Sequence, residues 1–218
     1  MKDTKVGKAA RVAVVHTSPV AVAPVTSFYA KAAPEIAACH TLDEGLMALL
    51  RDGAHQAVEA RLLATIQGAV RDQGAEAALI TCSALEASSL QALRARSAVP
   101  LIKIDEAMGR QAVRLGRRVG VVVTFAATRE PTAALLLSAA REAGVAVDLR
   151  EEIIPAAYEA LLAGEPGRHD TEVLAAVRRL AAGGAEVVVL AQVSMARVLA
   201  AAEAAVSVPV VSSLRGSL

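Results

Sequence analysis

Short apolar runs alternate along this chain with longer segments in which apolar residues recur at every third or fourth position. Continuous apolar runs of about four to eight residues predict parallel strands covered on both faces, because neither face of such a strand meets water. This pattern predicts strands over residues 11–17, 36–40, 77–82, 100–105, 118–125, 145–151, 186–192 and 208–213.

The segments between these strands carry apolar stripes at helical spacing. One stripe runs from Val58 to Val70 in four-residue steps, and another runs from Val173 to Leu180. We expect Asp170 or Thr171 to cap the second helix, because a side-chain oxygen there can accept a free backbone N–H. Strands that alternate with helices predict an α/β fold with parallel sheets.

The chain contains an internal repeat. RVAVVHT at position 11 matches RVGVVVT at 118, GAEAALITCSAL at 74 matches GAEVVVLAQVSM at 184, and SAVPLI at 97 matches VSVPVV at 206. Three matches in one order at offsets of 107, 110 and 109 are difficult to produce by composition alone. We predict two pseudo-symmetric, Rossmann-like α/β halves with the site in the cleft between them. The halves cover residues 1–106 and 107–206, and 207–218 pack back onto the first.

Composition excludes several classes of function. Aromatic residues make up 2% of the chain and the net charge is +1, so neither nucleic acid nor a membrane is expected as a partner. Lys2, Lys5 and Lys8 precede an apolar run that is short and is followed by Pro19 and Pro24, which break a helix. The start of the chain is therefore read as a short tail and a buried strand, not as a signal peptide or a membrane span.

Cofactor and metal motifs are also missing from the sequence. The two cysteines, Cys39 and Cys82, have no paired spacing, which argues against a disulfide framework or a structural zinc site and suggests a cytoplasmic protein. No phosphate-binding glycine loop or HExxH pattern occurs. Lys103 lies in a predicted strand without a supporting pattern for pyridoxal phosphate. We expect no cofactor and no metal.

The candidate site follows from the strand ends, since ligands of open α/β sheets bind beyond the carboxyl ends of the strands. In the first half this places Thr17, Ser18, Cys82 and Ser83 in the cleft. In the second half it places Thr124, Gln192, Val193 and Ser194 there. The repeat brings Cys82 and Gln192 to the cleft from opposite sides. Backbone N–H groups and hydroxyls at helix starts would bind a carboxylate, and the same helix end would lower the pKa of the Cys82 thiol.

At these residues the chain resembles the aspartate/glutamate racemase superfamily, which includes hydantoin racemase, maleate isomerase and arylmalonate decarboxylase. TCSAL resembles the segment of the first catalytic cysteine, and VVVLAQVSMA resembles that of the second, whose cysteine falls on Gln192. RVGVVVTFAAT resembles the strand and loop with carboxylate-binding hydroxyls, here Thr124 and Thr128. The resemblance implies cofactor-independent proton transfer at the carbon next to a carboxylate, with two cysteines on opposite faces of a small substrate. It also implies a homodimer.

The sequence departs from that scheme because Gln192 has no titratable proton. Three hypotheses stay open besides an inert, buried Cys82. Cys82 acts alone on one face, as the single cysteine of arylmalonate decarboxylase does; a second base such as His16 or Cys39 replaces the missing thiol; or the site binds a carboxylate without catalysis. We expect an enzyme of the racemase or isomerase kind, or a related lyase. The sequence does not identify the substrate.

Overall fold

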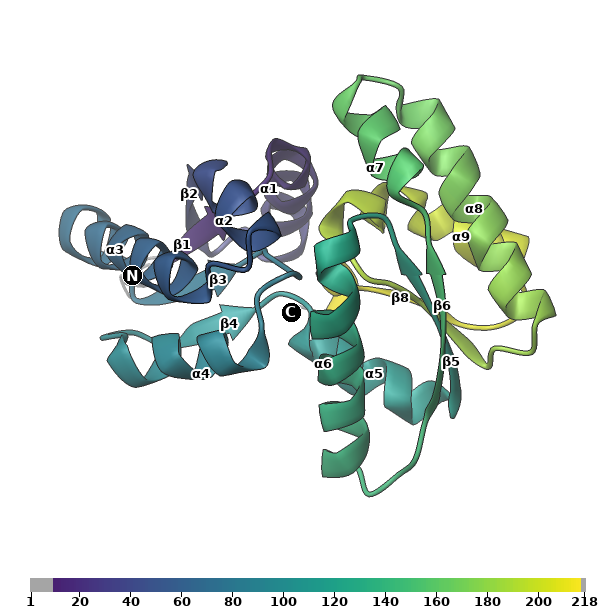
Figure 1. Cartoon of the computed structure of the whole chain (residues 1–218). Coiled ribbons are helices and arrows are strands. Elements are labelled where there is room, and N and C mark those ends of the chain that lie inside the picture. Colours follow the sequence, from purple (N-terminus) through teal and green to yellow (C-terminus); the bar gives the residue numbers. More distant parts are fainter. Residues whose placement is uncertain (1–9, 217–218) are drawn as a thin grey trace, which may run out of the picture.

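Two four-stranded parallel sheets form the framework of the protein in the computed structural model, which describes residues 10–216 (Figure 1). The first sheet has the order β2-β1-β3-β4 and the second has the order β6-β5-β7-β8. The strands are β1 (Arg11–His16), β2 (Ala37–Leu42), β3 (Ala77–Ile80), β4 (Leu101–Lys103), β5 (Arg118–Val123), β6 (Asp148–Ile153), β7 (Val187–Leu190) and β8 (Val210–Ser212). The predicted α/β fold with two similar halves is confirmed, whereas the domain boundaries stay a prediction.

The two sheets also share their register. Val12 of β1 pairs with Ala77 of β3, and the repeat-related Val119 of β5 pairs with Val187 of β7. The duplication seen in the sequence is therefore a duplication of hydrogen-bonded positions, not only of composition. As a consequence, the residues that follow β3 and β7 occupy equivalent places at the carboxyl edge of their sheets.

The repeated Gly-Ala-Glu that precedes β3 and β7 has a structural origin. Gly74 and Gly184 adopt φ values of 68° and 89°, which a residue with a Cβ rarely adopts. Ala75 and Ala185 follow and are both buried. The motif ends a helix and turns the chain into the central part of the sheet, so it carries no chemistry.

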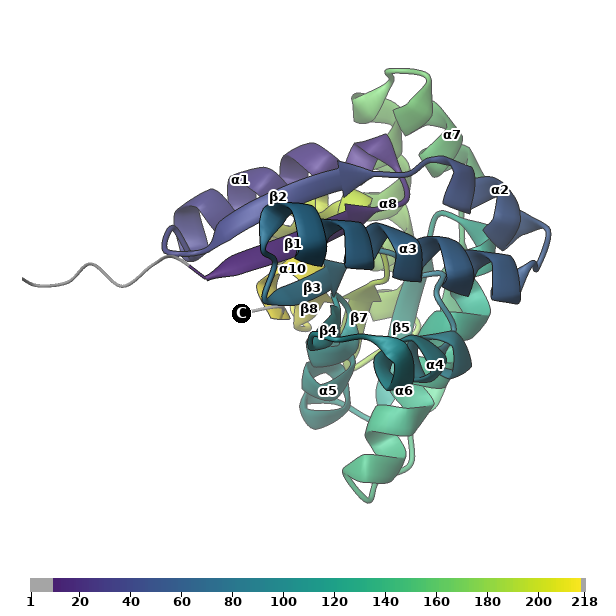
Figure 2. The same ribbon diagram turned by 90° about the vertical axis from the view of Figure 1, so that its left-hand side faces the viewer.

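Helices cover both faces of the first sheet, as Figure 2 shows for α1 and α3. Val15 packs with Leu62 on the α3 side, and Val14 packs with Val25 on the α1 side. The helices of this half and of the link to the next are η1 (Pro19–Ala21), α1 (Val22–Ala32), α2 (Gly45–Arg51), α3 (His55–Gln73), α4 (Ala87–Arg96) and α5 (Glu106–Leu115). This two-sided cover explains the continuous apolar runs.

The second sheet is covered in the same way. Val121, Leu136 and Val177 belong to one apolar cluster, the largest among the described residues. The helices here are η2 (Ala126–Thr128), α6 (Arg129–Glu142), α7 (Pro155–Leu162), α8 (Pro166–Ala182), η3 (Val193–Val198), α9 (Leu199–Ala205) and α10 (Ser213–Gly216). Leu214 of α10 packs with Val14 of the first half. None of the helices within residues 10–216 is long and apolar enough to cross a membrane.

Proline positions account for two wrong predictions. α8 begins at Pro166, upstream of the expected caps at Asp170 and Thr171, because proline is favoured in the first turn of a helix, where its missing N–H costs nothing. Pro24 lies in the first turn of α1 for the same reason and does not break it. The predicted tail with Lys2, Lys5 and Lys8 lies outside the described residues.

Candidate active site

A cavity of about 50 Å³ lies at the carboxyl ends of the strands, and both halves contribute to its wall. From the first half it is lined by Thr17, Ser18, Val20, Ala21, Met47, Thr81, Cys82, Ser83 and Ala84. From the second half it is lined by Phe125, Thr128, Tyr158, Gln192, Val193 and Ser194. A water molecule needs about 10–15 Å³ of such space, so this volume accommodates a small polar group such as a carboxylate with its neighbouring carbon.

Eight of the nine residues predicted for the site line this cavity, and Thr124 is the exception. The backbone N–H of Thr124 donates to Gln192 Oε1 at 2.8 Å, and its hydroxyl is fully buried without a hydrogen-bond partner in the described part of the chain. Thr124 lies just beyond the end of β5 and is bonded to the cavity residue Gln192 through its backbone. Phe125, not Thr124, presents its side chain to the cavity.

The sulfur of Cys82 is buried, with 4% of the residue exposed. Burial raises the pKa of the Cys82 thiol above its usual range, because it disfavours the charged thiolate. A hydrogen bond from Thr17, the charge of Lys103 and the backbone N–H of Ala84 act in the opposite direction. The expectation of an acidic thiol was therefore wrong. The helix that was expected to lower the pKa, α4, begins only at Ala87, so Cys82 does not lie at its N-terminus.

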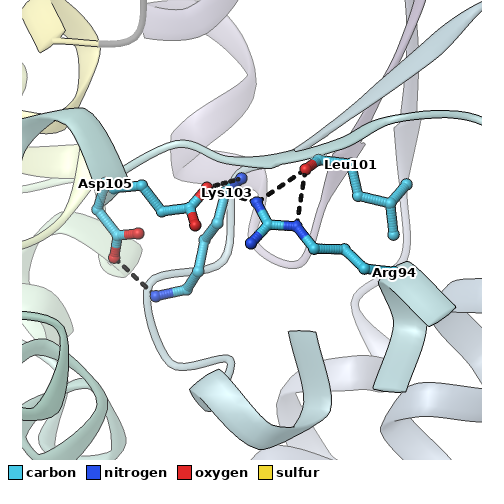
Figure 3. Close-up of polar contacts among 5 residues, drawn as sticks. Arg94, Leu101, Lys103 and Asp105 are labelled. Carbon is cyan, nitrogen blue, oxygen red and sulfur yellow. Dashed lines mark hydrogen bonds and ion pairs between the residues drawn. The ribbon is translucent and has the colours of Figure 1, made fainter. Parts of the chain in front are cut away.

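Lys103 and Asp105 form a buried ion pair (Figure 3), which lies against the loop of Cys82 because Lys103 also bonds Ser83. Lys103 Nζ donates to Asp105 Oδ2 at 2.9 Å and to the carbonyl oxygen of Ser83 at 3.2 Å. Both charged residues are at most 3% exposed. Burial raises the pKa of Asp105, and the ammonium of Lys103 opposes that rise. Sequence reasoning missed this pair because Lys103 and Asp105 read as part of an apolar strand.

The side-chain amide of Gln192 is held in place through its oxygen atom. Its Oε1 accepts the backbone N–H of Thr124, so the amide nitrogen provides the donors that remain for a ligand. Beside it, Ser194 lines the cavity with a buried hydroxyl that has no partner among residues 10–216. The second half thus offers hydrogen-bond donors at the position where the repeat places a thiol in the first half.

Tyr158 and Met47 are site residues that sequence reasoning missed. Tyr158 OH lies 2.8 Å from Ser18 Oγ, which joins the two halves across the cavity, and its ring packs against Phe125 with centroids 5.6 Å apart. Met47 lies in α2 and Tyr158 in α7, the helices that follow the second strand of each half. Extending the repeat to these two helices would have placed both residues near the cleft.

His16 and Cys39, considered as substitutes for a second base, do not line the cavity. His16 is fully buried; its Nδ1 lies 3.1 Å from Thr81 Oγ1 and its Nε2 lies 2.9 Å from His40 Nδ1. Burial, and then the charge of His40, lowers the pKa of His16 to about 4, so His16 is neutral at pH 7. The thiol of Cys39 faces the carbonyl of Ala37 at 3.9 Å. The hypothesis that either is the second base is not supported.

Several proteins of known structure share this fold. A glutamate racemase isoform from Bacillus anthracis shares 14% identity, with a TM-score of 0.71 over 96% of this chain and 79% of that one. An allantoin racemase from Pseudomonas fluorescens shares 20% identity, with a TM-score of 0.63 over 94% of this chain and 86% of that one. An aspartate racemase homologue from Pyrococcus horikoshii shares 14%, with a TM-score of 0.66 over 95% of each chain. At such identities these likenesses show a common fold.

No curated protein sequence matches the chain. The sequence does match the family described as Asp/Glu/Hydantoin racemase, over residues 26–215. That range begins within α1 and ends within α10, so it includes every strand except β1 and every loop that lines the cavity except the turn after β1. Given a match of this extent, the chain belongs to the Asp/Glu/Hydantoin racemase family and is an enzyme of the racemase or isomerase kind.

Proposed function

We propose that this enzyme transfers a proton, without a cofactor, at the carbon next to the carboxylate of a small substrate, and that Cys82 carries the proton. The observation that supports the proposal is the position of the sulfur. Cys82 is the one cysteine that lines the cavity shared by the two halves, and Gln192, its repeat-related residue, lines the same cavity.

The carboxylate would be held by neutral donors. Hydroxyls of Ser18, Ser83 and Ser194 line the cavity, together with Thr17 and Thr128. The hydroxyl of Ser194 has no other partner among the described residues, so a substrate oxygen can accept its proton without displacing an existing bond. Donors fixed in a small cavity stabilise the enediolate formed when the carbon next to a carboxylate loses its proton.

The environment of Cys82 sets the direction in which it works best. A thiol whose pKa is raised by burial is protonated at neutral pH, so it is ready to donate a proton to a carbanion. To remove a proton it must first become a thiolate, and the Thr17 hydroxyl and the Lys103 charge favour that form. Racemisation or isomerisation needs both directions and is the function that family membership favours.

The residue Gln192 favours a second candidate function. This is a lyase that removes carbon dioxide from its substrate and then protonates one face of the resulting carbanion. The amide accepts the N–H of Thr124 and has no group that ionises at neutral pH. A decarboxylation needs only one proton donor, which the protonated Cys82 thiol supplies. This candidate resembles the single-cysteine chemistry of arylmalonate decarboxylase.

Incubation with a substrate panel in D2O separates these functions. The panel contains aspartate, glutamate, hydantoins, allantoin, substituted malonates and maleate, and NMR follows the proton on the reacting carbon. Deuterium incorporation with the carbon skeleton intact supports proton transfer of the racemase kind, and deuterium with release of carbon dioxide supports the lyase. If ligands raise the melting temperature but no panel member exchanges, the protein binds carboxylates without catalysis and the proposal is wrong.

The homodimer and the cytoplasmic location stay predictions. The oligomeric state is measured directly by light scattering or sedimentation of the purified protein.

A further inference from the structure

We propose that the phenol of Tyr158 is the second proton-transfer residue and acts on the face of the substrate opposite Cys82. This inference rests on the proposed function and makes it specific, since a tyrosine then stands in for the thiol that position 192 lacks.

The arrangement of the lining residues is the first support. Cys82 enters the cavity from the loop after β3 in the first half, and Tyr158 enters it from α7 in the second half. The other lining residues carry aliphatic side chains, hydroxyls of serine or threonine, a phenyl ring, a thioether or an amide, none of which is an ionisable side chain. Cys82 and Tyr158 are therefore the two titratable side chains of the cavity, and they come from opposite halves.

The second support is the way in which the phenol is held. Tyr158 is 8% exposed, and its oxygen lies 2.8 Å from Ser18 Oγ, a residue that itself lines the cavity. Packing of the ring against Phe125 fixes its plane, with centroids 5.6 Å apart. A phenol donates its proton while neutral and accepts one once ionised, and Ser18 can serve either state because a hydroxyl is both donor and acceptor.

Cys82 and Tyr158 together account for both proton transfers of an inversion. The Cys82 thiolate takes the α-proton from one face, so the C–H bond breaks, an S–H bond forms and the electron pair enters the enediolate. The Tyr158 O–H bond then breaks as its proton forms a new C–H bond on the opposite face, leaving a phenolate. One proton has moved from oxygen to sulfur, and exchange with solvent or the reverse reaction restores the starting state.

The test compares Tyr158→Phe with Cys82→Ala on the separate enantiomers of an active substrate in D2O. In Tyr158→Phe we expect inversion to fall by roughly a hundredfold or more, while one enantiomer continues to exchange its α-proton with retention through Cys82. In Cys82→Ala we expect the mirror result, with exchange confined to the other enantiomer. Chiral chromatography and mass spectrometry give the ratio of inversion to exchange for each variant.

Tyr29→Phe is the matched control, because it removes the same hydroxyl from a buried tyrosine that does not line the cavity. A merely structural role for Tyr158 would leave the inversion-to-exchange ratio unchanged in both variants, whereas the proposal predicts that only Tyr158→Phe lowers it. An unchanged ratio in Tyr158→Phe would overturn the inference, as would exchange without any inversion in the unaltered enzyme. Absence of exchange from the whole panel would instead overturn the proposed function.

Discussion

The two halves of this enzyme have the same strand order and register, yet they present different chemistry to one cavity. The first half supplies a thiol, Cys82, where the second supplies an amide, Gln192, and the first supplies a thioether, Met47, where the second supplies a phenol, Tyr158. A duplicated scaffold therefore fixes where side chains meet the substrate without fixing which groups they are. In our account the titratable group of the second half lies not after β7, where Gln192 stands, but on α7, the helix that follows β6.

The halves differ again behind the site. His16 and His40 form a buried, hydrogen-bonded pair in the first half, and the strand register places Val123 and Glu151 at the same positions in the second. Val123 is fully buried and apolar. At this pair of positions, therefore, only the first half depends on keeping an imidazole neutral.

Acidification tests that difference and has the largest expected effect. The pKa of His16 is about 4 in the folded protein and about 6.5 in an unfolded chain, so the unfolded chain takes up the proton first as the pH falls. This contribution to the free energy of unfolding is complete above pH 6.5 and declines towards pH 4, by about 3 kcal/mol in all. Urea titrations from pH 7 to pH 4 should show this decline in the unaltered protein and a shallower one in His16→Gln. The prediction is contradicted if the free energy of unfolding falls equally with pH in both proteins. His55→Gln, at an exposed position, is the control.

Restoring the symmetry of the halves sharpens the comparison. If position 192 faces the substrate opposite Cys82, a thiol there replaces the lost phenol. We expect the double variant Tyr158→Phe/Gln192→Cys to invert its substrate about a hundredfold faster than Tyr158→Phe alone. Tyr158→Phe/Gln192→Ser, which adds no titratable group, should show no gain. A folded cysteine variant without gain would mean that position 192 does not reach the reacting carbon.

The ion pair behind Cys82 has no equivalent behind Gln192, and removing it should change thiol reactivity. Lys103→Met/Asp105→Asn removes both buried charges, which avoids leaving one unpaired. Because Lys103 lowers the Cys82 pKa more than Asp105 raises it, we expect a net rise. In a Cys39→Ser background, alkylation by iodoacetamide at pH 8 should slow roughly threefold to tenfold. An unchanged or faster rate would show that Lys103 does not favour the thiolate.

The smallest expected effect concerns packing. Ala13 of β1 corresponds to Gly120 of β5, and a Cβ on Gly120 would lie 3.0 Å from the Cβ of Leu180 in α8. Gly120→Ala should lower the free energy of unfolding by about 1 kcal/mol, because the helix must move away from the sheet. Urea unfolding measures the change. Equal stability would show that α8 can shift without cost.

Much of the fold could be predicted because its strands are buried on both faces and read as uninterrupted apolar runs. The repeat added the pairing of the halves, and with it the meeting of Cys82 with Gln192 in one cavity. The start of α8 could not be read correctly because Pro166 is a helix breaker in most positions and a good first residue in one.

The site was predicted less completely than the fold. Residues at strand ends could be placed in the site because parallel strands end at the same edge of a sheet. The position of Tyr158 could not, because it depends on the path of α7, which no local sequence pattern encodes. Long-range burial likewise decides the state of Cys82: its raised pKa follows from the packing of distant segments around the sulfur, not from the residues beside it.

The most direct test of the account is solvent-deuterium exchange at the substrate's reacting carbon, measured for the unaltered enzyme, Cys82→Ala and Cys39→Ala. We predict that, for the enantiomer whose proton faces Cys82, Cys82→Ala lowers the rate at least about a hundredfold, whereas Cys39→Ala, whose thiol lies outside the cavity, keeps the original rate. Undiminished exchange of both enantiomers in a folded Cys82→Ala variant would contradict the claim that this thiol carries the proton.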